Sequence, residues 1–175
     1  MSSFITITLQ PRPDAIGVIK PTMKFLELKI PPLALLIILA TGQYALGCLL
    51  PFGGVEIHGK LGLTIFMFLV GSLFALLGVY EFRKFGTTVN PINPDGTVAI
   101  VHTGIYSLTR NPMYVGFAFM LLSAVISTAN YVSLVSLPIY VLYMNRFQIE
   151  PEERLLAEKF GEAYNAYLQQ VRRWV

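Results

Sequence analysis

The sequence is short of cysteine, histidine and charge, and each shortage excludes a class of protein. A single cysteine, Cys48, forms no intramolecular disulfide, and together with only two histidines it offers no ligand set for a metal. Only 13% of the 175 residues are charged, against about 25% in soluble domains. With 54% hydrophobic residues, the chain has too few polar side chains to cover a water-facing surface. We therefore expect lipid to be the solvent for much of this protein.

The net charge of +3 raises the question of a nucleic-acid partner. The basic residues form no long run, however, and are scattered between apolar segments. The excess of Lys and Arg in cytoplasmic loops of membrane proteins explains this distribution better. We expect a lipid bilayer as partner and no nucleic acid; the sequence leaves the oligomeric state open.

Four apolar runs predict an all-α polytopic membrane protein with about four transmembrane helices. Two spans are expected within residues 30–82, because each run approaches the roughly 20 residues that a spanning helix needs. Residues 112–148 hold two further runs separated by only Ala129, Asn130 and Tyr131, which predicts a short helical hairpin. The whole chain is short enough for one membrane domain, 1–175.

Three more polar segments complete the predicted organisation. Residues 1–29 form an arm, residues 83–111 a polar loop rich in Pro and Gly, and residues 149–175 an amphipathic C-terminal helix. Four crossings would place all three segments, which carry most of the basic residues, on the same side. By the positive-inside rule this side is the cytoplasm, so we expect an integral protein of the inner membrane.

The first polar cluster is the stretch GIYSLTRNPMYVG, residues 104–116. Gly104 allows a turn, Asn111 is a natural helix cap, and Pro112 suits a first helical position. One interpretation is a well-capped membrane helix whose Arg110 reaches toward lipid head groups. The other is a binding site at the membrane surface.

The second cluster is RFQIEPEERLLAEKFG, residues 146–161. Arg146 and Glu150 lie four residues apart and can pair on one helix face, although Pro151 is expected to end that helix. Charges at a membrane boundary often mark a functional site, and the alternative is a surface ion pair that holds the tail. By spacing alone, Glu152 and Glu153 are expected to be solvated.

The two clusters together resemble the isoprenylcysteine carboxyl methyltransferase family, its bacterial relatives and the phospholipid methyltransferases grouped with them. The resemblance rests on GIYSLTRNPMYVG followed, across a short hairpin, by EERLL and FGEAYNAY, and covers roughly residues 75–175. It implies a membrane enzyme with S-adenosyl-L-methionine as cofactor, held in a cytoplasm-facing pocket. The acceptor would be a lipophilic small molecule or a prenylated substrate that enters from the bilayer.

The resemblance also implies roles for individual residues. The implied catalytic residues are Arg146, which would orient the acceptor, and Glu150, which would hold Arg146 or accept a proton. The implied cofactor-binding residues are His102, Gly104, Tyr106, Arg110, Asn111, Pro112, Tyr114, Glu152 and Glu153. A guanidinium suits the cofactor carboxylate, an acid suits its ribose hydroxyls and amino group, and tyrosine rings suit its sulfonium.

The chain departs from the eukaryotic members of that family at two positions. Asn111 stands where they usually have His, and Val98 stands where they carry another His, with His102 nearby but out of register. These departures concern the acceptor, which the sequence does not identify.

Two other functions remain open at this point. A membrane reductase of the sterol-reductase type would bind NADPH at a similar loop and has a comparable Arg-x-Pro-x-Tyr element, but the paired acids before Phe160 and Gly161 favour methyl transfer. A non-catalytic membrane protein is the third possibility. It predicts that Arg110, Arg146 and Glu150 tolerate alanine without any loss of cofactor binding.

Overall fold

The computed structural model describes residues 24–86 and 100–175. Most of these residues are helical, and the six α-helices are α1 (Pro32–Leu49), α2 (Lys60–Lys84), α3 (Pro112–Thr128), α4 (Ser136–Tyr143), α5 (Glu150–Phe160) and α6 (Glu162–Gln170). A π-helix, Met144–Ile149, joins α4 to α5. The predicted all-α class is therefore confirmed for the described part. Residues 1–23 of the predicted arm and 87–99 of the predicted loop, including Val98, lie outside it.

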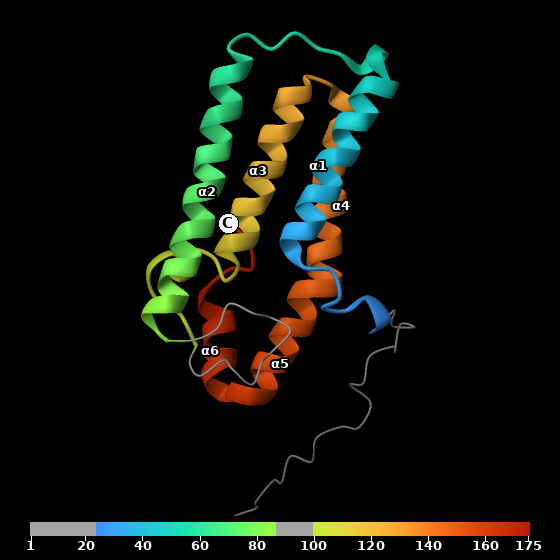
Figure 1. Ribbon diagram of the computed structural model, residues 1–175. Helices are drawn as coiled ribbons and strands as arrows, with labels where there is room; N and C mark the ends of the chain where they lie inside the picture. The colour runs from blue at the N-terminus through green and yellow to red at the C-terminus, as the bar shows by residue number, and fades with distance from the viewer. Residues whose placement is uncertain (1–23, 87–99) are drawn as a thin grey trace, which may run out of the picture.

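The first four α-helices run alongside one another, and α5 and α6 lie across one end of this bundle (Figure 1). The start of α1, the end of α2, the start of α3 and the end of α4 all lie at this same end. The described parts of the three polar segments therefore lie at this end of the bundle. Helix α3 is central, because α1, α2 and α4 all contact it.

Two helices in residues 24–86 and 100–175, α1 and α2, are long and apolar enough to cross a bilayer. Helix α3 is apolar but has only 17 residues, and α4 has eight and continues into the π-helix. The two N-terminal spans thus meet the length criterion for crossing. The count of four spans stays a prediction.

Two glycines allow α2 and α3 to pack closely. A Cβ atom on Gly71 would lie 2.5 Å from the carbonyl oxygen of Gly116, and a Cβ on Gly116 would lie 2.5 Å from that of Gly71. Further along the interface, a Cβ on Gly78 would lie 2.7 Å from the Met113 side chain. Glycine at these positions brings the helix backbones into direct contact, as is common between membrane helices. This contact fixes the start of α3 beside the end of α2.

The expectation that Pro151 ends the hairpin helix is wrong. The chain continues from α4 through the π-helix into α5, and Pro151 lies buried in the first turn of α5. Proline has no N–H and its ring clashes with the carbonyl of the residue four positions earlier. The wider turn of the π-helix accommodates this defect without breaking the helix.

The predicted single amphipathic helix over residues 149–175 is divided in two. Gly161 has φ +55° and ψ −126°, which is a conformation that is accessible essentially to glycine, and it separates α5 from α6. After Gln170 the chain leaves the helix and returns toward α3. This return places the last residues of the chain inside the site described next.

Candidate functional site

The C-terminal tail is bound to the loop before α3. The main-chain N–H of Arg110 donates to the carbonyl of Arg172 at 2.9 Å. The Thr109 hydroxyl and the Asn111 side-chain amide both donate to the carbonyl of Arg173, each at 3.0 Å. Asn111 occupies the N-cap position of α3, but its side chain holds the tail and makes no capping hydrogen bond. The tail thereby becomes one wall of the site.

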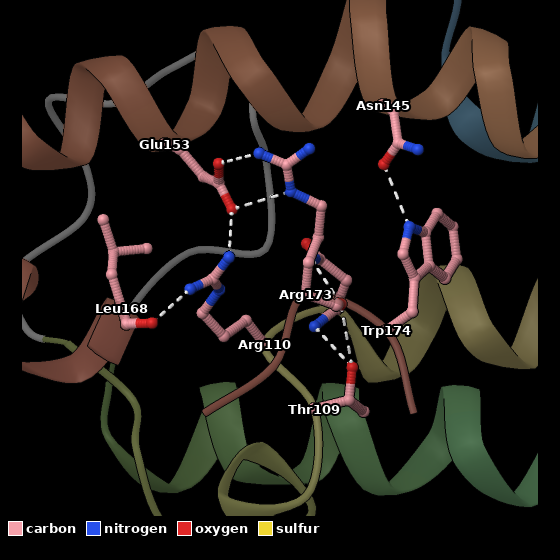
Figure 2. A network of polar contacts seen from close by, with 8 residues as sticks. Thr109, Arg110, Asn145, Glu153, Leu168, Arg173 and Trp174 are labelled. Carbon is pink, nitrogen blue, oxygen red and sulfur yellow. Dashed lines mark hydrogen bonds and ion pairs between the residues drawn. The ribbon is translucent and has the colours of Figure 1, made fainter. Parts of the chain in front are cut away.

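Arg110 and Arg173 share one carboxylate, that of Glu153. Figure 2 shows both guanidinium groups directed at it: Arg110 Nη2 lies 2.8 Å from Oε1, and Arg173 Nη2 lies 2.5 Å from Oε2. Arg110 also donates to the carbonyl of Leu168 in α6 at 2.8 Å. The side chains of Arg110 and Glu153 are only 12% and 16% exposed, so the expected solvated position of Glu153 is wrong. The hydrogen bonds to Glu153 raise the pKa of Arg173.

Glu152, the residue before Glu153, makes its hydrogen bonds with two uncharged side chains. The Tyr114 hydroxyl donates to Glu152 Oε1 at 2.7 Å, and the Gln148 amide donates to the same oxygen at 2.6 Å. Burial raises the pKa of Glu152 to about 7, against the opposing effect of these two hydrogen bonds. Glu152 therefore changes its protonation state near neutral pH, which is a property typical of functional acids.

This pKa predicts a pH-dependent stability. The ordinary glutamate value is 4.5, so between pH 4.5 and about 7 the unfolded chain loses a proton that the folded protein retains at Glu152. The free energy of unfolding should consequently fall as the pH rises through this window, by roughly 3 kcal/mol from this residue. Thermal unfolding in detergent from pH 4.5 to 8 measures the effect. The isosteric variant Glu152→Gln should flatten the profile, and an unchanged slope in that variant would contradict the assignment.

A hydrogen bond from α6 holds the main chain of Tyr106 next to the site. The Tyr167 hydroxyl of α6 donates to the Tyr106 carbonyl at 2.8 Å, and the Tyr106 ring packs edge-on against Phe82 of α2 at 5.2 Å. Gly104, two residues earlier, has φ +58°, and a Cβ there would lie 2.6 Å from the Glu81 carboxylate. Glycine at this position therefore lets the loop lie directly on the end of α2.

Arg146 and Glu150 form the predicted pair, with Arg146 Nη1 3.2 Å from Glu150 Oε2. Arg110, Arg173 and Glu153 together are called the Arg110 cluster below. The side chains of Arg146 and Glu150 are 36% and 44% exposed, which is more than any side chain of the Arg110 cluster. A third partner comes from the segment before α1, where Glu27 lies 3.8 Å from Arg146 and 2.6 Å from Arg154. The Trp174 indole donates to Asn145 at 2.9 Å, which connects the C-terminal tail to the residue next to Arg146 (Figure 2).

The structure brings most of the predicted site residues to one end of the bundle. Three of them, Glu150, Glu152 and Glu153, belong to α5. Direct contacts to α5, α6 or the tail are made by Tyr106, Arg110, Asn111, Tyr114 and Arg146. Pro112 is buried at the start of α3, and Gly104 contacts α2. His102 is exposed, and its ring lies 6.5 Å from that of Phe85. No contact joins it to the Arg110 cluster within the described residues.

The polar members of the site that sequence reasoning missed include Arg173, Gln148, Glu81 and Glu27. Gln148 precedes Glu152 by four residues, a spacing that places both on one helix face and could have identified it. Glu81 interrupts an apolar run at the end of α2, and the Thr103 hydroxyl donates to it at 2.8 Å. Nothing local marks Arg173, because its role depends on the return of the tail.

The arrangement has the chemistry of a site for an anionic ligand with polar groups. Two guanidiniums face one carboxylate, and Arg110 Nε is a buried donor without a hydrogen-bond partner in the described residues. A second carboxylate, that of Glu152, is half-buried beside them, and its pKa is raised to about 7. Such a set can bind a carboxylate through arginine and hydroxyl or amino groups through glutamate.

Comparisons with known proteins identify the family of the chain. An uncharacterized protein of Haemophilus influenzae is 38% identical over 63 residues, which are 36% of this chain and all of that protein. No solved structure matches the chain. The model of the phospholipid methyltransferase family matches residues 60–163, from the start of α2 to the start of α6 and more than half of the chain. The protein therefore belongs to the phospholipid methyltransferase family, a family of membrane methyltransferases.

Proposed function

We propose that the protein is a methyltransferase that uses S-adenosyl-L-methionine and acts on a lipophilic acceptor at the cytoplasmic face of a four-span membrane domain. The observation that carries this proposal is the meeting of Arg110, at the start of α3, with Glu153 of α5 inside the family-matched region. These residues are 43 positions apart in sequence and come from the two motifs on which the resemblance rests. The cofactor would supply a methyl group on a sulfonium that is already activated for displacement.

The residues at this end of the bundle fit such a cofactor. The free Nε–H of Arg110 and the excess of two guanidiniums over one carboxylate suit the amino-acid carboxylate of the ligand. Glu153 and Glu152 would suit its amino group and ribose hydroxyls, and the aromatic ring of Tyr106 would suit its sulfonium. Holding these groups in fixed positions and excluding water are the main contributions that a protein makes to a direct displacement.

The second charged group, Arg146 with Glu150, is assigned to the acceptor. An acidic acceptor such as an isoprenylcysteine carboxylate would be its own nucleophile, and Arg146 would orient it while Glu150 holds the guanidinium. A lipid amine or thiol would instead lose its proton to Glu150. Both kinds of acceptor are lipophilic, and the transfer experiment described below distinguishes them.

Cofactor binding gives the direct test. Purified protein in detergent should bind S-adenosyl-L-methionine with a micromolar Kd by calorimetry, and Arg110→Ala should weaken binding about 10- to 100-fold, because a charge-assisted contact contributes about 1.5–3 kcal/mol. Arg83→Ala removes an exposed cation at the end of α2 and is the matched control, with no expected change. Folded protein that NADPH stabilises against heat and S-adenosyl-L-methionine does not would contradict the proposal.

The acceptor can then be identified by transfer. Tritiated methyl groups from the cofactor should appear in a product formed from a membrane lipid extract, and mass spectrometry of the labelled product gives the acceptor class. A carboxyl methyl ester would assign the isoprenylcysteine type, and a methylated amine would assign the phospholipid type.

A further inference from the structure

The segment that precedes α1 is bound to the acceptor side of the proposed site, although it lies outside the residues matched by the family. Its Leu28 N–H donates to the carbonyl of Phe147, in the π-helix, at 2.9 Å. Leu28 has φ +57°, which is rare for a residue with a branched side chain and is strained. Contacts on either side of Leu28 must therefore hold the segment in this conformation.

Pro151 explains why the docking point exists. In an α-helix the carbonyl of Phe147 would accept from the N–H of the residue four positions later, which is Pro151, and proline has none. The π-helix leaves this carbonyl able to receive a donor from another segment, and Leu28 provides it. The main-chain bond sets the register of the neighbouring residue, Glu27.

Glu27 joins two cations that lie on either side of Pro151. Its Oε2 is 2.6 Å from Arg154 and its Oε1 is 3.8 Å from Arg146, while its own side chain is only 10% exposed. Oε1 is buried and makes no hydrogen bond within the described residues. Arg146 thus lies between two carboxylates, Glu150 from its own helix and Glu27 from a segment more than a hundred residues earlier.

We propose that Glu27 is a positioning residue for the methyl acceptor, acting through Arg146; this rests on the role given to Arg146 in the proposed function. A partly exposed arginine with one partner on its own helix keeps much of its side-chain freedom, and such pairs contribute little. A second carboxylate on a separate, main-chain-docked segment restricts the guanidinium to one orientation before the acceptor arrives. Glu27 lies on the acceptor side only, so cofactor binding at Arg110 and Glu153 does not depend on it.

The test is Glu27→Gln, which keeps the shape and removes the charge. Transfer of tritiated methyl from S-adenosyl-L-methionine to vesicles of a bacterial membrane lipid extract should show a KM for the lipid raised about tenfold, with kcat changed less than about threefold. The Kd for S-adenosyl-L-methionine should stay within about twofold. Glu27→Asp should recover most of the loss, and Glu158→Gln, an exposed acid on α5, is the charge-matched control. An unchanged KM in Glu27→Gln, or a parallel loss in KM, kcat and cofactor affinity, would overturn the proposal.

A second measurement reads the contact without any activity. A double-mutant cycle of Glu27→Gln and Arg146→Gln on thermal unfolding should give a coupling of at least about threefold in the unfolding equilibrium constant. Additive effects would overturn the positioning role whatever the enzyme does. Coupling in a protein that binds no S-adenosyl-L-methionine and transfers no methyl group would instead refute the proposed function, and with it the part that Glu27 has in catalysis.

Discussion

Replacing Gly71 by alanine is expected to lower the free energy of unfolding by about 2 kcal/mol or more, within the range found for overpacked interiors. The added Cβ would lie 2.5 Å from the Gly116 carbonyl and 2.9 Å from the Met120 main-chain nitrogen, and these backbone atoms cannot move without shifting α3. The α2–α3 interface is also the most extensive helix contact of the described bundle. A shift of α3 carries Arg110 and Tyr114 away from α5, so cofactor affinity should fall together with stability.

Gly62→Ala is the matched control for this substitution. Gly62 lies in the same helix, but a Cβ there would have no neighbour within 4 Å. Alanine should therefore be neutral or should stabilise α2 by up to about 1 kcal/mol, through helix propensity alone. Chemical or thermal unfolding of the two variants in the same detergent makes the comparison. Equal unfolding midpoints for the two alanine variants would mean that α2 and α3 do not meet at Gly71 and Gly116.

Replacing Glu153 by alanine is expected to have a comparable or larger effect, at about 3 kcal/mol, because it removes the only carboxylate seen to join Arg110 and Arg173 in the described residues. Breaking a buried ion pair by removing one partner typically costs about 3–5 kcal/mol, since the remaining charge stays desolvated. Here two like charges would be left close together, although Arg173 is 31% exposed and can reach water. The C-terminal tail should then detach from the loop before α3.

The same variant tests the tail as a wall of the site. Trp174 is the single tryptophan of the chain, and its indole is bonded to Asn145, so its fluorescence reports tail docking. Glu153→Ala should shift this emission to longer wavelength and abolish cofactor binding, whereas Glu162→Ala, an exposed acid on α6, should change neither. Retained stability and emission in Glu153→Ala would show that the ion-pair cluster does not hold the tail.

Much of the bundle could be predicted because its signals are local. The apolar runs were expected within residues 30–82 and 112–148, and the helices are found there, at Pro32–Leu49, Lys60–Lys84, Pro112–Thr128 and Ser136–Tyr143. Helix starts at Pro32 and Pro112 follow from the fixed φ of proline, which is compatible with a first turn. The number of helices that cross the bilayer did not follow, because the third and fourth runs are short and α4 gives way to a π-helix.

The candidate site was predictable only through the resemblance. Spacing alone treats Glu152 and Glu153 as solvated, since acids on an amphipathic helix usually face water. The structure leaves both only half-exposed, because α5 turns across the end of the bundle and α6 folds back at Gly161. Arg173 and Glu27 had no local pattern, and both reach the site from the ends of the described chain.

The sequence by itself determined that this protein is built from apolar helices with its charges gathered in a few segments, because hydropathy and proline position act within one stretch of chain. Only the tertiary structure decided which charges meet: Arg110 with Glu153, Arg173 with the same acid, and Glu27 with Arg146. Ion pairs between distant segments depend on helix packing and on where each helix ends. The missing Cβ atoms at Gly71 and Gly116 and the missing N–H at Pro151 set that packing. Through it, these residues decide contacts between segments that are far apart in the sequence.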